Sequence, residues 1–366
     1  MLTCRPDATQ TWCASHYSDV LLKEGDARHA EYSQKASKFY DQALQLLQDR
    51  TYPLHTRISA ILDLRLGQIE RQGASAAYFL LACGDYFIQE ECGARPRLNL
   101  TTLAGSECVF FRSFAYLDVI RTICVKGRKT VFDLRSGDAP EDGTAPGPLC
   151  PPREVLLKPD EGAVEPVMGD ALSVHLGLPV GLLLCFASIS NLLVDSADLG
   201  GAELDAQAAA ILRRIRAWRP PPSEHDVTDS ALHISDLATQ EIWRHACLIY
   251  FHSTLQKLGP LATPLRASLK QVLQLASSLL PADHGQHPSV FTARARAPAW
   301  FLAATVAVTA EEREVCREHL EECGDGKVWR DNQDVVERLW DKVDRTGAGV
   351  DWREECEKEG WAVAFM

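Results

Sequence analysis

The stretch ECVFFRSFAYLDVIRTICV, residues 107–125, is long enough for about five turns of helix. It holds four charged residues, and its apolar residues recur at helical spacing. One apolar stripe, at steps of four, three, three and four, consists of Phe110, Phe114, Leu117, Ile120 and Cys124. A helix that is apolar on nearly every side must be surrounded by other helices, so this stretch predicts the centre of an all-helical core.

Helical periodicity continues on both sides of this stretch. Helices are predicted before it at 29–48, 54–72 and 74–91, and after it at 180–194, 202–218, 231–258, 265–280, 299–309, 311–322, 332–344 and 351–359. Strand-like alternation is absent, and no 34-residue recurrence supports a helical repeat array. The sequence therefore predicts an all-α fold of roughly a dozen helices.

The segment from about residue 127 to 165 interrupts this pattern. Its part 136–152 is rich in proline and glycine, a composition that favours a loop or a disordered linker. Long loops in compact domains are either insertions or functional covers, and nothing here suggests fixed chemistry, so we expect a flexible insertion. The predicted organisation is an N-terminal segment, 1–28, followed by one helical domain, 29–366.

The composition limits the classes of partner. Of the 366 residues, 46% are hydrophobic and 24% are charged, which is enough apolar surface for a sizeable core. The net charge of -12 and the pI near 5.4 argue against broad attraction to nucleic acid or to an anionic membrane. Residues 176–194 are uncharged and near the length of a membrane span. Pro179, the polar residues within the run and the lack of flanking Lys or Arg favour a buried helix instead.

The twelve cysteines form no CxxC pair, which argues against a zinc knuckle and against a thioredoxin-type motif. Cysteines in apolar surroundings behave as small hydrophobes when they are reduced. Five are of this kind: Cys83, Cys108, Cys124, Cys185 and Cys247. The pattern indicates a reducing compartment, and the first residues lack the basic and apolar segments of a signal peptide.

Two pairs that contain histidine have residue types that can bind a metal ion. His225-Asp226 resembles the metal-binding pair of the histidine-aspartate phosphohydrolases, but it follows three prolines, so a surface turn or a helix cap is favoured. Glu241 and His245 are four residues apart on a predicted helix. That spacing can bind metal, but it is also the ordinary spacing of a stabilising surface pair, which we favour.

Two further clusters contain charged or metal-binding side chains. Asp283, His284 and His287 stand in a Pro/Gly loop, where adventitious metal binding is the alternative and the absence of any specific role is favoured. Asp118 and Arg121 interrupt the most apolar helix. A buried Arg could bind an anionic effector, but an ion pair within this helix or with a neighbouring one is the simpler interpretation.

The basic cluster Arg213, Arg214 and Arg216 stands at the end of a predicted helix, where cations suit the helix dipole. Such short clusters are usually solvated helix faces, so a role in DNA contact or nuclear import is the less favoured alternative. No glycine-rich phosphate loop, GxSxG elbow or HExxH motif is present. The sequence therefore predicts no enzyme, with no catalytic, cofactor-binding or metal residues and no cofactor. It assigns no residue to a ligand pocket.

Several segments follow one another in a characteristic order. They are FAYLDV with its small basic turn within 110–132, the helix start Gly177-Leu178, Trp218-Arg219-Pro220, EIWRHACLIYFHSTL at 241–255, Pro298-Ala299-Trp300-Phe301, Asn332, Trp340 and Asp351-Trp352. Together they resemble the fungal-specific transcription factor domain, the helical regulatory region that commonly follows a zinc binuclear cluster in fungal regulators. The resemblance runs from about residue 30 to the end of the chain.

This resemblance implies a nuclear transcription regulator that acts through an effector and dimerisation domain. It implies protein partners, as a homodimer or heterodimer or in the transcription machinery, a small apolar effector between helices, and no membrane. The family's DNA-binding module uses six closely spaced cysteines around two zinc ions. Here only Cys4 and Cys13 precede residue 83, which argues against direct DNA binding. The alternative is a helical scaffold without a transcriptional role.

Overall fold

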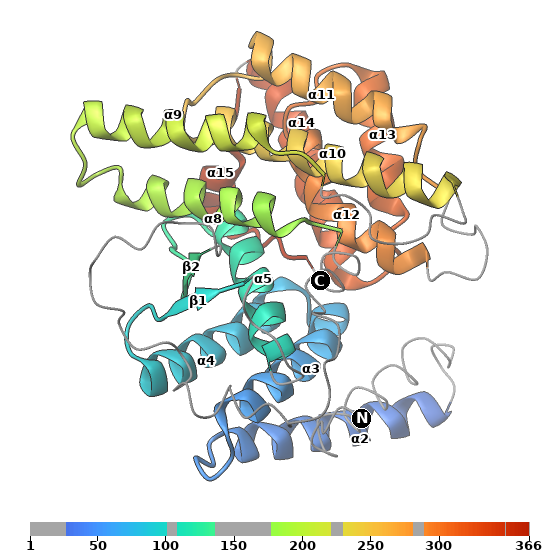
Figure 1. Ribbon diagram of the computed structural model, residues 1–366. Helices are drawn as coiled ribbons and strands as arrows, with labels where there is room; N and C mark the ends of the chain where they lie inside the picture. The colour runs from blue at the N-terminus through green and yellow to red at the C-terminus, as the bar shows by residue number, and fades with distance from the viewer. Residues whose placement is uncertain are drawn as a thin grey trace.

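The apolar stretch quoted above forms helix α5 (Cys108–Cys124), at the centre of the molecule (Figure 1). The computed structural model describes residues 27–100, 108–135, 177–220, 230–280, 289–347 and 349–365. Every residue from Phe114 to Cys124 is buried, as the apolar character of all sides of this helix requires. Helix α5 packs against α3 (Leu54–Gln72) on one side and α8 (Val180–Asp195) on the other.

The helices before α5 form the lower part of the molecule in Figure 1. Helix α3 starts directly after Pro53, where a missing backbone N–H costs nothing. It ends at Gly73, whose φ of 80° is readily adopted only by glycine, and the chain turns back into the next helix. The resulting hairpin of α3 and α4 packs closely. The other helices of this part are α2 (Ala27–Leu47) and α4 (Ala74–Cys92).

The helices after α5 form the upper part of the molecule in Figure 1. Helix α10 (Ser230–Thr254) is central here, because it contacts α8, α9, α11 and α12. The described residues contain twelve helices in all, in agreement with the prediction. The remaining ones are α9 (Gly201–Ala217), α11 (Thr263–Ala276), α12 (Ser289–Ala304), α13 (Ala310–Glu321), α14 (Lys327–Thr346) and α15 (Trp352–Glu359).

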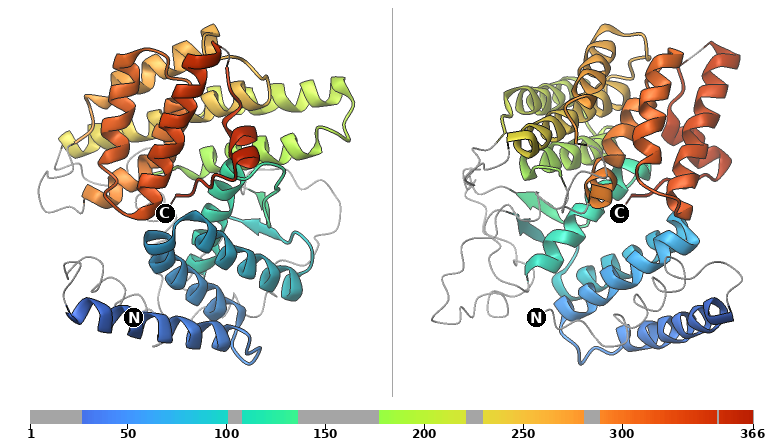
Figure 2. Two further views of the ribbon diagram at one scale, coloured as in Figure 1. Left: turned by 180° about the vertical axis from the view of Figure 1, so that it is seen from behind. Right: turned by 90° about the vertical axis from the view of Figure 1, so that its right-hand side faces the viewer.

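The two parts share one hydrophobic core, and the C-terminal end of the chain lies between them (Figure 2). Helix α14 packs against α3, so the last long helix of the chain contacts one of the first. The residues after α15 run in an extended form into this junction. Asn332 of α14 donates to the Ala364 carbonyl at 2.8 Å, and Tyr78 of α4 donates to the Val363 carbonyl.

A short parallel strand pair corrects the expectation that strands are absent. Strand β1 (Arg97–Asn99) pairs with β2 (Asp133–Arg135), with Leu98 opposite Leu134. Three residues are too few for an alternating pattern to be recognised in the sequence. The segment between α5 and β2 folds back against α5, and its residues Val131 and Phe132 are buried. This course of the chain brings β2 beside β1.

Two helices begin earlier than the periodicity predicted. Helix α12 starts at Ser289 and continues through Pro298, although a helix starting at residue 299 was expected. Proline removes one backbone hydrogen bond but has a φ compatible with helix, and the helix is buried on both sides of it. Helix α14 starts at Lys327 rather than at residue 332, and Val328 and Trp329 of its first turn are buried.

The start of the expected insertion is packed rather than loose, since residues 130–132 are buried and β2 follows them. The rest of that segment, and the expected N-terminal segment up to residue 26, lie outside the described residues. The uncharged run at 176–194 contributes α8, which lies in the core. No helix in the described ranges is long and apolar enough to cross a membrane.

Candidate functional site

The charged pair expected on α5 exists and belongs to a larger cluster. Arg121 lies 3.4 Å from Asp118 on the same helix and also pairs with Asp85 of α4. Arg128, which follows α5, lies 2.6 Å from Asp118 and 2.8 Å from Asp85. Burial raises the pKa of Asp118, although both arginines oppose this effect. Two arginines and two carboxylates balance each other, so this cluster is structural and needs no anionic effector.

Glu241 and His245 lie within ion-pair distance, as their spacing predicted, but His245 is largely buried rather than at the surface. Glu241 pairs more closely with Arg244 at 2.7 Å, whereas His245 Nε2 is 3.9 Å from the Glu241 carboxylate. Burial, assisted by the charge of Arg244, lowers the pKa of His245 to about 4 against the opposing effect of Glu241. The ring is therefore neutral at pH 7. Its Nδ1 is buried and has no hydrogen-bond partner among the described residues.

The other two histidine candidates, at 225–226 and 283–287, lie outside the described residues. In the part of the chain that the structure describes, no group of three His, Cys, Asp or Glu side chains could hold a metal ion. Seven cysteines there are free, in line with the expected reduced state. Cys92 differs, because it is disulfide-bonded.

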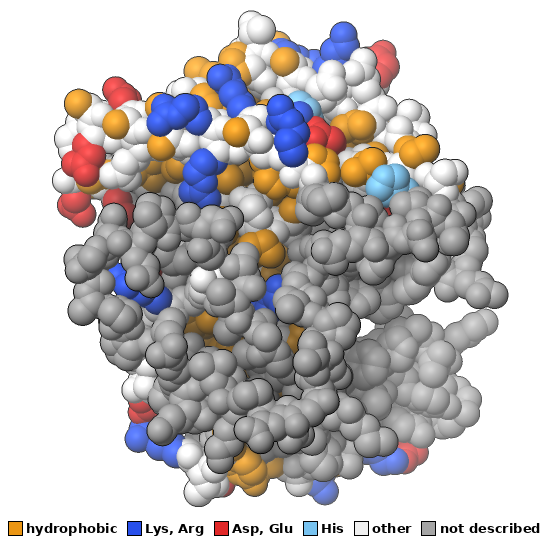
Figure 3. Space-filling model, in the orientation of Figure 1, with side chains coloured by type: hydrophobic (Ala, Val, Ile, Leu, Met, Phe, Trp, Pro, Cys, Tyr) orange, Lys and Arg blue, Asp and Glu red, His pale blue; other side chains and the backbone are white. Residues whose placement is uncertain are grey.

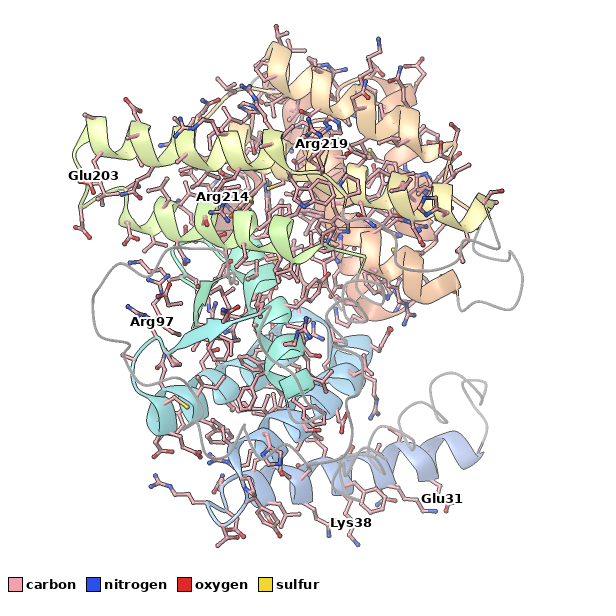
Figure 4. All side chains as sticks on the ribbon, in the orientation of Figure 1. Glu31, Lys38, Arg97, Glu203, Arg214 and Arg219 are labelled. Carbon is pink, nitrogen blue, oxygen red and sulfur yellow. The ribbon has the colours of Figure 1, made fainter. Side chains whose placement is uncertain are left out.

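The basic cluster lies where the sequence predicted, at the end of α9. Arg213, Arg214 and Arg216 are exposed there, and Glu203 lies in the first turn of the same helix (Figure 4). Negative charge at the start and positive charge at the end is the order that the helix dipole favours. Figure 3 shows Lys and Arg side chains gathered along α9. Most of the cluster is therefore a solvated helix face.

A hollow of about 400 Å³ is lined by residues of α9, α10 and α11, and we call it the α9–α11 hollow. Its floor consists of the buried or largely buried residues His245, Leu248 and His252 of α10 and Ser268 of α11. Its rim is exposed and consists of Arg216 of α9 and Pro264, Ala267, Lys270, Gln271 and Gln274 of α11. Among these ten lining residues there is no Asp or Glu.

Helical spacing brings these side chains together. On α10, His245, Leu248 and His252 are separated by three and four residues, so they share one face. On α11, the buried Leu265 and Leu269 pack into the core and turn a polar stripe, which includes Lys270, toward the rim. The hollow therefore has a polar wall over a mostly buried floor.

The positive charge of the hollow at pH 7 comes from two side chains. Burial lowers the pKa of His252, the charge of Arg216 lowers it further, and a hydrogen bond to Gln256 opposes them. His252 and His245 are therefore both neutral at pH 7, and Arg216 and Lys270 carry the charge. Neither of these two has an ion-pair partner among the described residues.

Sequence reasoning missed this site, although two of its signals were present. Polar residues recur on α11 at 270, 271 and 274 with helical spacing, and histidines recur on α10 at 245 and 252. Each pattern marks one helix face. Only the packing of α10 against α11, with the end of α9 beside them, shows that these faces meet.

Comparison with known families gives one match. The model described as the fungal specific transcription factor domain matches residues 7–366. No curated protein and no solved structure matches the chain. The match covers the whole helical body described above, including α5, the α9–α11 hollow and the C-terminal end.

Proposed function

The chain belongs to the family of the fungal-specific transcription factor domain, and from this premise we propose that its helical body receives a regulatory signal and passes it to protein partners in the nucleus. The observation that carries this proposal is the extent of the family match, which spans residues 7–366. Because the match includes every described helix, the regulatory function belongs to the helical body as a whole.

The α9–α11 hollow is the place we propose for the signal to enter. Its floor belongs largely to α10, and α10 contacts four other helices. A ligand that binds against α10 therefore touches the helix that contacts the most other helices in the upper part of the molecule. Differential binding to two arrangements of these helices would shift their populations.

A partner surface is proposed on α4. Phe79 and Tyr86 are seven residues apart on this helix and are 57% and 58% exposed. They therefore share one face, and large exposed apolar side chains on one face are typical of protein interfaces. This surface supports the dimerisation or partner binding that the family implies. Light scattering of the parent and of the Phe79→Ser/Tyr86→Ser variant tests it. A dimeric parent and a monomeric variant support self-association through α4, and a dimer of unchanged strength in the variant contradicts it.

The net charge of -12 favours action through partners rather than direct DNA contact. An electrophoretic shift assay at moderate salt tests this part of the proposal. Tight, sequence-specific binding of DNA by the chain alone would contradict it.

The decisive experiment tethers the chain to an unrelated DNA-binding domain and measures a reporter gene in fungal cells. A change in reporter expression relative to the DNA-binding domain alone is expected, together with nuclear accumulation of the fluorescently tagged chain. A destabilised variant such as Phe114→Ala serves as the control that must lose the effect. An inert, stably expressed chain outside the nucleus would favour a helical scaffold without a transcriptional role.

A further inference from the structure

We propose that the α9–α11 hollow binds a small anion that carries carboxylate or phosphate groups. The inference rests on the proposed function in that this anion would be the signal. It differs from the apolar effector that the family resemblance implied, and it follows from the charge, the donors and the size of the hollow.

The charge of the hollow is positive and uncompensated. Arg216 and Lys270 stand on its rim from two different helices, and neither has an ion-pair partner in the described part of the chain. The lining contains no carboxylate, although the whole chain has a net charge of -12. Arg216 is also close enough to His252 to lower the pKa of that ring. An anion placed between α9 and α11 would therefore interact with both cations at once.

Polar groups deeper in the hollow extend this site. Ser268 and His252 are each 4% exposed and lie in the floor. His245 also lines the hollow. A purely apolar ligand would shield the Ser268 hydroxyl and the His252 ring from water without hydrogen bonding to them, which costs free energy. An anion with hydroxyl, carboxylate or phosphate oxygens can pair with them.

The size of the hollow indicates a small molecule. About 400 Å³ is within the range of small-ligand sites and too small for a folded partner. Leu248, Pro264 and Ala267 give it an apolar portion that suits a short carbon skeleton. The ligand class is therefore a small metabolite with two or more negative charges.

Isothermal titration calorimetry of the full chain with citrate and with pyrophosphate tests the proposal, at constant ionic strength set by sodium chloride. Saturable binding of one anion per chain is expected for at least one probe, and none for glycerol. Binding of citrate alone assigns a carboxylate ligand, and binding of pyrophosphate alone assigns a phosphate ligand. If neither probe binds at up to about 10 mM, the proposal is overturned.

Two charge-matched double variants locate the site. Arg216→Gln/Lys270→Gln should weaken binding by roughly tenfold or more, because both rim cations are lost. Lys38→Gln/Arg213→Gln removes the same charge from exposed positions outside the hollow and should bind as the parent does. Circular dichroism verifies that both variants are folded. Equal weakening in both variants would overturn the proposal, because it would show a general effect of net charge.

This experiment and the reporter experiment fail independently. Anion binding by a chain that is inert in the reporter assay would support the site and contradict the proposed function. A chain that is active in the reporter assay but binds neither anion would support the function and overturn this inference.

Discussion

Phe114 packs into a space that a neighbouring glycine leaves open. A Cβ added at Gly84 of α4 would lie 2.4 Å from Cε2 of the Phe114 ring, so α4 and α5 approach closely only because residue 84 has no side chain. The Phe132 ring meets Phe114 edge to face, with ring centroids 6.4 Å apart. Residues of α4 and of the segment after α5 therefore both pack against the Phe114 ring of α5.

Replacing this ring should create a cavity. Phe114→Ala is expected to lower the free energy of unfolding by about 3 to 5 kcal/mol, because the side chain is fully buried. Urea unfolding followed by circular dichroism measures the loss. The control is Leu261→Ala, at a position that is 77% exposed, which should change stability by about 0.5 kcal/mol or less. A loss below about 1 kcal/mol for Phe114→Ala would show that α5 is not central.

His245 should make the stability of the protein dependent on pH. Its pKa is lowered from 6.5 to about 4 in the folded chain, chiefly by burial. Between these values the unfolded chain binds a proton that the folded chain does not. The free energy of unfolding therefore falls as the pH is lowered from 6.5 toward 4, by about 3 kcal/mol from this group.

The variant His245→Gln removes this contribution. Denaturant unfolding at pH 7 and at pH 5 should show a smaller loss of stability on acidification for the variant than for the parent. The difference between the two proteins isolates this residue from the other titrating groups. An identical loss in both proteins would mean that the folded ring is protonated as easily as the unfolded one.

At the scale of the elements, α5 is joined to the segment that follows it by Asp118. One oxygen of this carboxylate pairs with Arg128, and the other accepts from the Val131 backbone N–H at 2.7 Å. The chain is thereby held under α5, which places β2 beside β1. The short strand pair and the buried ion cluster are parts of one arrangement.

Asp118→Ala should therefore cost about 3 to 5 kcal/mol, because Arg121 and Arg128 would share the single carboxylate of Asp85 and the buried Val131 N–H would lose its acceptor. The same unfolding measurement applies. Lys126→Ala is the control from the same segment, since Lys126 is 40% exposed and its pairs with Glu354 and Glu357 lie at the surface. That change should cost less than about 1 kcal/mol. Equal losses would mean that the buried cluster contributes no more than a surface pair.

At the scale of the whole molecule, the C-terminal end holds the two parts together. Asn332 exchanges two hydrogen bonds with Ala364, at 2.8 and 3.3 Å, and Arg65 of α3 donates to the Phe365 carbonyl. All these groups are buried. The end of the chain thus contacts both α3 and α14, and we expect the residues from 29 onward to unfold as one unit.

Asn332→Ala tests this closure. It should lower the free energy of unfolding by about 1 to 3 kcal/mol, because buried groups of the chain end lose their partners. Seven of the eight tryptophans stand between residues 218 and 361, so fluorescence reports the upper part, whereas circular dichroism reports all helices. In the parent protein the two transitions should coincide. Separate transitions in the parent would divide the chain into two domains.

The sequence alone determined the helices, the burial of α5 and the pairing of Asp118 with Arg121. It also placed the basic residues at the end of α9. Each of these features depends on residues three or four positions apart, which lie within a single helix. The order of the motifs over about 300 residues also predicted the family, which the match over residues 7–366 confirms.

Only the tertiary structure decided which helix faces meet. The α9–α11 hollow joins Arg216, His245 and Lys270 from three helices, the lowered pKa of His245 follows from burial, and the contact of Asn332 with Ala364 depends on how the chain end returns to the core. No local pattern encodes these contacts, because their free energy arises from residues that are distant in the chain. The hydrophobic pattern predicts which residues are buried, and the packing determines what they are buried against.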